Sequence, residues 1–468
     1  MTYLFLTYYY RFDNLIPTKG ILNRQPYKEI LMSTVTKRAY LKVLAGGGTF
    51  MKHIKMFRAA LAALVTVLCF NVEAKVWTIS RNAQAYSGTQ VKITCEDGAQ
   101  IYLSDNSWNT YKSGNITLGV RGKGYTSIVA SGPNGVLDLR DIVISNGGVD
   151  YPITSVALPQ YSFHNTKGKG VVDIYINNVN SIGTLLLPYA TTDSSDCSAK
   201  KVVISGTFES VSANAFCLCT SLTNVVLESA NLKTIGERAF FNCRGLNCDI
   251  SNIVLPTVTS IGASAFAADS SASSGKQMNI KGVVDIKQLD YLGNSAFLQC
   301  SKLEKFIARS GEITSIPDGS TWQGVFFGTG LKHLELNCPK LNSVGASVFK
   351  NSTSLTNIVI GSTNLVTWGS NLSCANLKAV TFYGESNNTV VDRILSGVST
   401  STTTKKCTIY ADRGVKFGWK EKAASLTATE EPLAPEDCFG VYRSGSRKAW
   451  LVNHRSPFRE DGFKIIIR

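Results

Sequence analysis

The chain has 468 residues, of which 44% are hydrophobic and only 17% are charged, and it contains 39 glycines. This balance is typical of an extracellular β-rich protein and excludes a disordered chain. Residues 1–74 hold ten of the 48 basic and three of the 33 acidic side chains, so the remaining 394 residues carry 38 against 30, a net charge of +8 in place of +15. The excess of positive charge is mild, and residues 75–468 contain no block of five like charges. It argues against a nucleic-acid-binding footprint and weakly favours acidic partners.

Residues 51–74 predict a secretory signal peptide. A basic segment from Met51 to Arg58 precedes a nearly unbroken apolar run of 12 residues from Ala59 to Phe70. Val72-Glu73-Ala74 then matches the small-x-small cleavage rule. The run is too short for a stable membrane anchor. A buried helix of a folded domain is the alternative.

Residues 1–50 show no periodicity. They precede the signal peptide, and a signal peptide does not normally follow a segment of this length. We interpret them as a mis-assigned upstream extension, with Met51 or Met56 as the true start. A lipid anchor at Cys69 is disfavoured, because Leu68 is not the small residue that a lipobox requires.

Residues 75–150 predict a small all-β unit. Turn signals such as Glu96-Asp97-Gly98 separate short apolar segments at intervals of about 8–12 residues. The expected strands are Val76–Ile79, Val91–Cys95, Ile101–Leu103, Asn115–Val120 and Thr126–Ala130. We expect this unit to cap a stack of repeats, which would otherwise expose its first apolar layer, and independent ligand binding is the alternative.

Residues 151–385 repeat one motif. The phrase Ala-Phe-x-x-Cys-x-x-Leu occurs at Ala215–Leu222, Ala239–Leu246 and Ala296–Leu303. The repeat phenylalanines Phe216, Phe240, Phe266, Phe297 and Phe349 are 24, 26, 31 and 52 residues apart, and the last gap equals two periods. A period of about 20–29 residues is typical of a leucine-rich-repeat solenoid, in which each unit packs against its neighbours.

Each repeat predicts a coil that contains a strand, a turn and a short helical turn. Alternating apolar residues follow the repeat leucine, as in Leu222–Leu227, and predict a strand with one face inward. A glycine precedes the helical turn, at Gly236, Gly262, Gly293 and Gly345, and is expected to supply a positive φ. We expect one buried stack of Phe216, Phe240, Phe297 and Phe349 with Leu222, Leu303 and Leu355.

Cysteines occupy one position of the repeat. Cys219, Cys243, Cys300 and Cys374 lie three residues before the repeat leucine, where weaker copies have Gly328 and Ser352. Such a position needs a small side chain, and a buried thiol meets this need as a weak donor. We predict reduced thiols rather than disulfides, because the Cβ vectors of stacked neighbours are parallel.

The phrase Ile-Gly-x-x-Ala-Phe-x-x-Cys-x-x-Leu resembles the BspA-like leucine-rich repeat family of bacterial surface antigens over residues 200–385. The resemblance implies a secreted or surface-exposed solenoid that functions in adhesion or host-protein binding, and it implies no catalytic residue. Residues 267–290 depart from the pattern, since a Ser-rich stretch replaces the Cys and Leu positions. We expect that coil to bulge into a loop.

Residues 386–468 predict a final strand, a linker and a C-terminal β cap. Cys407–Tyr410 is the expected final strand, and Glu430–Pro435 has the composition of a linker. Further strands are expected at Phe439–Tyr442, Ala449–Val452 and Phe463–Arg468, the first two joined by a hairpin turn at Ser444-Gly445-Ser446.

No arrangement of residues indicates catalysis or metal binding. The histidines beyond residue 74 are His164, His333 and His454, which are far apart, and no zinc, phosphate-loop or nucleophile-elbow motif occurs. We therefore predict a protein that is not an enzyme and that has no catalytic residue, cofactor or metal.

The outward face of the repeat strands is the predicted binding surface, with an extracellular or host protein as partner. Residues between the inward positions should stack into two columns on one sheet face: Asn224, Val226, Lys305, Ile307, His333, Glu335, Asn357, Val359, Ala379 and Thr381. Val226, Ile307 and Val359 are apolar at positions that should be exposed, which often marks an interaction surface. A loop that covers them is the alternative.

A glycan-binding surface protein is the alternative function. Trp108, Trp322, Trp368, Trp419 and Tyr111 could stack on sugar rings if they are exposed, whereas packing in the core or in a cap is their plainer role. Exposed coplanar aromatic rings would favour a glycan. A smooth strand face with mixed polar residues would favour a protein.

Overall fold

The computed structural model describes residues 75–84, 89–104, 110–118, 128–159, 170–183, 198–269, 277–320, 322–362, 364–370, 374–383, 388–397, 407–411, 423–445 and 447–453. The chain divides into two units, Met1–Glu73 and Ala74–Arg468, and all described residues belong to the second. The predicted extension and signal peptide, Trp108, Trp419, His164, His454 and the predicted strand 463–468 lie outside the described residues.

The N-terminal sheet has the strand order β5-β3-β2-β1-β7-β8. Its strands are β1 (Val76–Gln84), β2 (Thr89–Cys95), β3 (Gln100–Leu103), β5 (Ile128–Ala130), β7 (Val143–Asn146) and β8 (Val149–Pro152). Neighbours are antiparallel except for β1 and β7. Alternation along these strands buries Trp77, Ile93 and Ile101 completely. The predicted all-β character of this region is confirmed.

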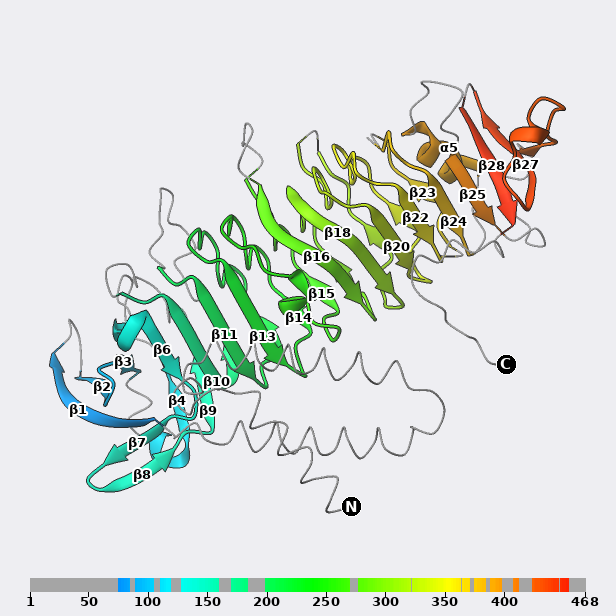
Figure 1. Ribbon diagram of the computed structural model, residues 1–468. Coiled ribbons are helices and arrows are strands. Elements are labelled where there is room, and N and C mark those ends of the chain that lie inside the picture. The colour runs from blue at the N-terminus through cyan, green and yellow to red at the C-terminus, as the bar shows by residue number, and fades with distance from the viewer. Residues whose placement is uncertain are drawn as a thin grey trace, which may run out of the picture. The chain divides into compact units, whose positions relative to one another are not determined.

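A ten-stranded sheet follows, and it runs through the first coils of the solenoid (Figure 1). On one side of the coils, β6 (Val136–Leu139), β10 (Asp173–Ile182), β11 (Lys201–Gly206) and β13 (Asn224–Ser229) are parallel neighbours. The other side has β4 (Asn115–Thr117), β9 (Ser155–Leu158), β12 (Ser210–Val211), β14 (Thr234–Ile235), β15 (Ser260–Ile261) and β17 (Tyr291–Leu292). The long β10 pairs on both sides and joins them. Short 3₁₀ helices are η1 (Tyr111–Ser113) and η2 (Pro133–Gly135).

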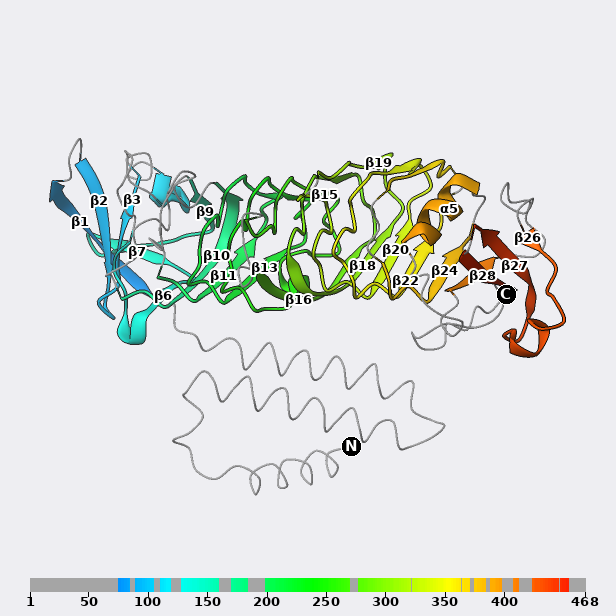
Figure 2. The ribbon, with the colours of Figure 1, turned by 90° about the horizontal axis from the view of Figure 1, so that it is seen from above.

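The later coils carry a nine-stranded sheet and a three-stranded sheet on opposite sides, which Figure 2 shows from above. The larger sheet has β16 (Met278–Ile286), β18 (Cys300–Arg309), β20 (His333–Asn337), β22 (Asn357–Ile360), β24 (Ala379–Phe382), β25 (Cys407–Ala411), β28 (Arg447–Asn453), β27 (Cys438–Ser444) and β26 (Ala423–Ala424), in that order. The smaller has β19 (Ser315–Ile316), β21 (Ser343–Val344) and β23 (Thr367–Trp368). The described chain is thus a mostly β leucine-rich-repeat solenoid with β units at its ends.

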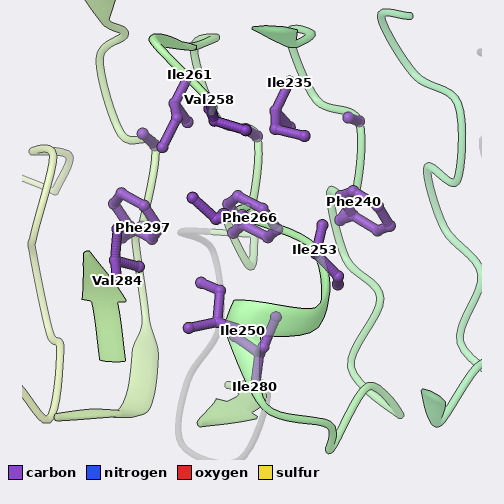
Figure 3. Packing of buried hydrophobic residues seen from close by; sticks show 14 of the residues in the cluster. Ile235, Phe240, Ile250, Ile253, Val258, Ile261, Phe266, Ile280, Val284 and Phe297 are labelled. Atoms are coloured by element: carbon purple, nitrogen blue, oxygen red, sulfur yellow. The ribbon is translucent and has the colours of Figure 1, made fainter. Parts of the chain in front are cut away.

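A column of aromatic rings fills the interior of the coils. Phe216, Phe240, Phe266, Phe297, Phe326 and Phe349 stack nearly parallel with successive ring centroids 5.0, 5.3, 5.5, 5.7 and 5.4 Å apart. Phe326 occupies the period that the 52-residue gap skips, and Trp368 ends the column 5.9 Å from Phe349. Figure 3 shows three of these rings with the isoleucines packed beside them. The predicted burial is confirmed, since the four named phenylalanines and the leucines at 222, 303 and 355 are at most 2% exposed.

The Ala-Phe segment is a ladder of turns, not the helical turn that the sequence suggested. Alternate amides bond within the turn, as Phe241 N donates to Arg238 O at 3.1 Å. The amides between them bond to the next coil, as Phe240 N donates to Ala265 O and Asn242 N donates to Ala267 O, both at 2.8 Å. Arg238 and Asn242 have positive φ values of 54° and 56°. This left-handed conformation turns every second amide toward the neighbouring coil, so the backbone is satisfied without a helix.

The repeat glycines serve close packing rather than a positive φ, which corrects the prediction for Gly236, Gly262, Gly293 and Gly345. None of the four has a left-handed φ. A Cβ atom added at Gly293 would lie 2.2 Å from Ala263 N of the preceding coil, and one at Gly236 would lie 2.5 Å from Ala213 N. The coils approach each other here so closely that only glycine fits.

The cysteine position is a hydrogen-bond donor position. The thiol of Cys243 donates to Phe216 O at 2.8 Å, and that of Cys300 donates to Phe266 O at 3.2 Å, each in the preceding coil. Burial raises the pKa of Cys300, which keeps it a neutral donor. All ten cysteines among the described residues, including Cys219, Cys243 and Cys300, are free in the structure.

Weaker copies of the repeat place a hydroxyl at the cysteine position. Ser352 donates to Phe326 O, and Thr329 donates to the same carbonyl at 3.0 Å. Thr329 lies three residues after Phe326, as Cys243 lies three after Phe240, so it and not the predicted Gly328 is the equivalent residue in that coil. Its hydroxyl differs in that it bonds to a carbonyl of its own coil. Gly328 has a φ of 65° and matches Asn242 in the turn ladder.

Two consecutive coils differ from the pattern in opposite ways. Where the coil after β13 should have a strand, it has the 3₁₀ helix η3 (Ile250–Asn252), because Asp249 caps the turn by accepting from Ser251 N at 2.9 Å. The next coil was predicted to bulge into a loop within residues 267–290. Residues 278–286 form β16 instead, and residues 270–276 lie outside the described residues. Met278, Ile280, Val284 and Ile286 are all buried, and this burial explains the strand.

The C-terminal end closes with a helix and a hairpin. Helix α5 (Asn388–Ser396), which the sequence reading missed, packs Val390, Val391, Ile394 and Leu395 onto the last coils. The hairpin of β27 and β28 turns at Ser444–Arg447, as predicted. The predicted linker at Glu430–Pro435 instead contains the 3₁₀ helix η5 (Glu431–Leu433) and the buried carboxylate of Glu430, whose ion pairs are described below.

Candidate interaction surface

Eight of the ten predicted residues form two adjacent columns on the outward face of the nine-stranded sheet. Register pairing joins Lys305, His333, Asn357 and Ala379 in one column, and Ile307, Glu335, Val359 and Thr381 in the other. We call these eight residues the outer strip. Their neighbours Phe306, Leu334, Ile358 and Val380 are at most 1% exposed, so the inward alternation predicted from the sequence is correct.

Asn224 and Val226 lie on the other large sheet, which corrects the expectation of one continuous surface. Their register partners are Lys201 and Val203 on β11. Because η3 replaces the strand of the following coil, β13 and β16 end up in different sheets.

Arg309 links two carboxylates at the first end of the outer strip. Its guanidinium pairs with Asp285, and its Nε lies 3.6 Å from Glu335 Oε1. These acids are the register partners of Ile307 on either side. Ile307 is only 7% exposed, so the prediction that it faces solvent was wrong. His333 Nε2 lies 3.7 Å from Glu335 Oε2 and completes the charged end.

The centre of the outer strip is neutral and accessible. Asn357, Val359, Ala379 and Thr381 are all half-buried, and none carries a charge. Tyr383, at the end of the same stretch of chain, is 56% exposed. This part of the face combines amide and hydroxyl groups with small apolar side chains.

A loop of the chain itself covers the second end of the two columns. The columns continue from Ala379 and Thr381 to Thr408 and Tyr410 on β25, and then to β28. Residues 425–437, which we call the closing loop, join β26 to β27. Its residues Leu426 and Ala434 pack against a cluster containing Tyr410 and Trp450, which are 9% and 7% exposed.

Glu430 anchors the closing loop to the hairpin. Its carboxylate pairs with Arg443 at 2.8 Å and with Lys448 at 3.2 Å, and its side chain is 7% exposed. The Thr427 amide, with the Lys448, Thr427 and Arg443 side chains, lowers the pKa of Glu430 to about 2. The carboxylate is therefore charged at all physiological pH values.

The repeat region matches one known family. A profile of the BspA type leucine rich repeat region, in six copies, matches residues 149–273, 194–320, 245–363 and 292–409, which together cover more than half of the 468 residues. The chain belongs to the BspA-type leucine-rich repeat family. No curated protein matched the sequence.

Three solved structures are similar to this BspA-type chain. A leucine rich cell surface protein from Faecalibacterium prausnitzii is 13% identical with a TM-score of 0.21, over 68% of this chain and 94% of its own. A leucine-rich repeat protein from Bacteroides ovatus is 15% identical with a TM-score of 0.17, over 65% and 92%. The pneumococcal vaccine antigen PcpA is 12% identical with a TM-score of 0.23, over 69% and 94%.

The aromatic residues of the glycan alternative do not form a shared platform in the described part of this BspA-type chain. Tyr111 and Trp368 are 0% and 2% exposed and pack in the interior. Trp322 is 65% exposed, and Lys350 Nζ lies 5.7 Å from its ring centroid. Of the predicted aromatic residues that the structure describes, Trp322 alone is accessible, and it has a neighbouring cation.

Within the described ranges, no group of three or more His, Cys, Asp or Glu side chains is placed to hold a metal ion. The helices in the same ranges include none long and apolar enough to cross a membrane.

Proposed function

We propose that this BspA-type chain is a secreted or cell-surface protein that binds a protein partner through the outer strip, in adhesion or host interaction. The observation that carries the proposal is that the strip is continuous with the face under the closing loop. There Leu426 and Ala434 already pack on the same two columns. A face that holds one polypeptide segment at its covered end is suited to hold another at its open centre.

The chemistry of the open centre supports a protein rather than a small ligand. Asn357 and Thr381 offer hydrogen bonds, Val359 and Ala379 offer small apolar contacts, and Tyr383 lies exposed near the edge. Apolar contacts surrounded by polar groups, with an aromatic side chain, are typical of protein interfaces.

The test changes the open centre and compares it with the same columns on the other sheet. We expect V359E/T381R to weaken binding of an identified extracellular host protein by about tenfold or more, since two long charged side chains would fill the open centre and would have to lose their water on docking. The matched control is V203E/V226R, at half-buried outward positions that are register partners on β11 and β13, and it should bind as the unchanged chain does. Equal melting temperatures would establish that both variants fold. Loss of binding in the control alone would move the site to the other sheet.

Export has its own test. The sequence from Met51 to Ala74 supports cleavage before Lys75. N-terminal sequencing of the protein recovered outside the cell should find Lys75 first, and recovery of a chain that still begins at Met1 would contradict this part of the proposal.

A glycan is the second candidate ligand, because Trp322 is exposed beside Lys350. A ring stacked on Trp322 would explain selective signals on a glycan array. W322A should abolish such signals while leaving binding at the outer strip unchanged.

A further inference from the structure

Stacking brings four lysines that are far apart in the sequence to one corner of five successive coils. Lys281 and Lys302 are register partners on β16 and β18. Lys332 N donates to Glu304 O, Thr356 N donates to Lys332 O, and Lys378 N donates to Thr356 O, which places 304, 332, 356 and 378 at the same position of successive coils. Lys302 lies two residues before this position on β18. We call Lys281, Lys302, Lys332 and Lys378 the lysine row. It follows the corner where the strands of the nine-stranded sheet begin.

The lysine row is accessible and carries an excess of positive charge. All four side chains are exposed. Glu304 faces Lys332 at 3.7 Å, with both side chains more than half exposed, and such pairs are weak in water. Across the described residues no carboxylate forms an ion pair with Lys281, Lys302 or Lys378. The backbones of Asp249 and Lys281 form an isolated β-bridge. Neighbouring coils are about 4.8 Å apart, so the row extends over about 19 Å along the stack.

We propose that the lysine row binds a linear acidic polysaccharide that carries carboxylate or sulfate groups. A band of exposed cations that crosses five coils attracts a linear polymer, whose negative charges can reach several of the lysines at once. A folded protein is a poorer fit, because lysine is depleted at the cores of protein interfaces. A nucleic acid is also a poorer fit, because the row has no aromatic ring for bases to stack on. This site is separate from the outer strip.

Binding of defined polymers to the purified full chain tests the proposal. The probes are heparin, polygalacturonate, neutral dextran and a single-stranded DNA oligonucleotide. We expect the two acidic polysaccharides to bind, with an affinity that falls as salt rises, and dextran not to bind. No binding of either acidic polysaccharide at low salt would overturn the proposal. Equal or tighter binding of DNA would replace it with a general polyanion site.

A charge-matched pair of variants locates the site. K302E/K332E/K378E should weaken polysaccharide binding by about tenfold or more and reduce its salt dependence. K233E/K287E/K340E changes the net charge equally at exposed lysines beyond the strand ends, and it should stay within about twofold of the unchanged chain. Equal losses in both would show that net charge alone attracts the polymer.

If the first variant melts early, the corresponding Lys→Gln variant replaces it. V359E/T381R, which tests the outer strip, should leave polysaccharide binding unchanged.

Discussion

The two sides of each coil follow different rules. On the turn-ladder side, positions repeat because the neighbouring coil dictates them: Gly293 has no room for a Cβ, Phe266 fills the column, and Cys300 donates to a carbonyl of the preceding coil. On the sheet side, inward residues are constrained, but the outward residues of the outer strip differ from coil to coil. The comparison teaches that the turn ladder maintains the stack and leaves the sheet face free to acquire binding functions.

The largest effect should come from the aromatic column. Phe266→Ala leaves a cavity between the rings of Phe240 and Phe297, which lie 5.3 and 5.5 Å away. We expect a loss of about 3–5 kcal/mol in the free energy of unfolding, measured by denaturant titration. Tyr291→Ala, at a position that is 53% exposed on the next coil, should change it by less than about 0.5 kcal/mol. Equal losses would remove the distinction between column and surface.

Two glycines of the same ladder should respond differently. Gly293→Ala forces a Cβ toward backbone atoms 2.2 Å away, and should cost about 1–3 kcal/mol of stability. Gly328→Asn keeps a left-handed φ that Asn242 and Asn351 already adopt at equivalent positions, and should cost less than about 1 kcal/mol. Thermal unfolding of both variants checks this, and a reversed order would mean that φ, not close packing, selects glycine at 293.

The donor position can be tested at Cys300. Cys300→Val leaves Phe266 O without its donor and should cost about 1–3 kcal/mol. Cys300→Ser should cost less, because Ser352 makes the same bond to Phe326 O two coils later. Thiol titration of the unfolded chain without reductant should find Cys219, Cys243 and Cys300 free, and a mapped disulfide among them would contradict the donor role.

The smallest effect is a pH dependence on the sheet side. The pKa of Glu430 falls from its ordinary value of 4.5 to about 2 in the folded chain. The charged carboxylate therefore stabilises the folded chain fully above pH 4.5, and this stabilisation is lost as the pH falls through 2. Glu430→Gln should lower the melting temperature at pH 6, and the difference from the unchanged chain should vanish near pH 2. A constant difference across this range would show that Glu430 does not anchor the closing loop by its charge.

Several local expectations failed because they depended on contacts between coils. The glycine before Ala-Phe looked like a turn residue in a single repeat, and only the distance to Ala263 revealed its packing role. The helical turn was the plausible local solution for the next residues, yet bonds such as Phe240 N to Ala265 O favour a ladder of turns. Ile307 looked exposed because the alternation says nothing of the carboxylates and the arginine around it.

The sequence by itself determined the solenoid, the buried phenylalanine column, the small donor at the cysteine position and the inward and outward alternation of the strands. These features are encoded by period and spacing within one repeat, so they can be read without knowing how coils meet. Only the tertiary structure decided that η3 separates Asn224 and Val226 from the outer strip, that the closing loop covers its far end, and that four distant lysines form a row. Each of these depends on which coil stacks on which, and that register arises from the packing of the whole chain.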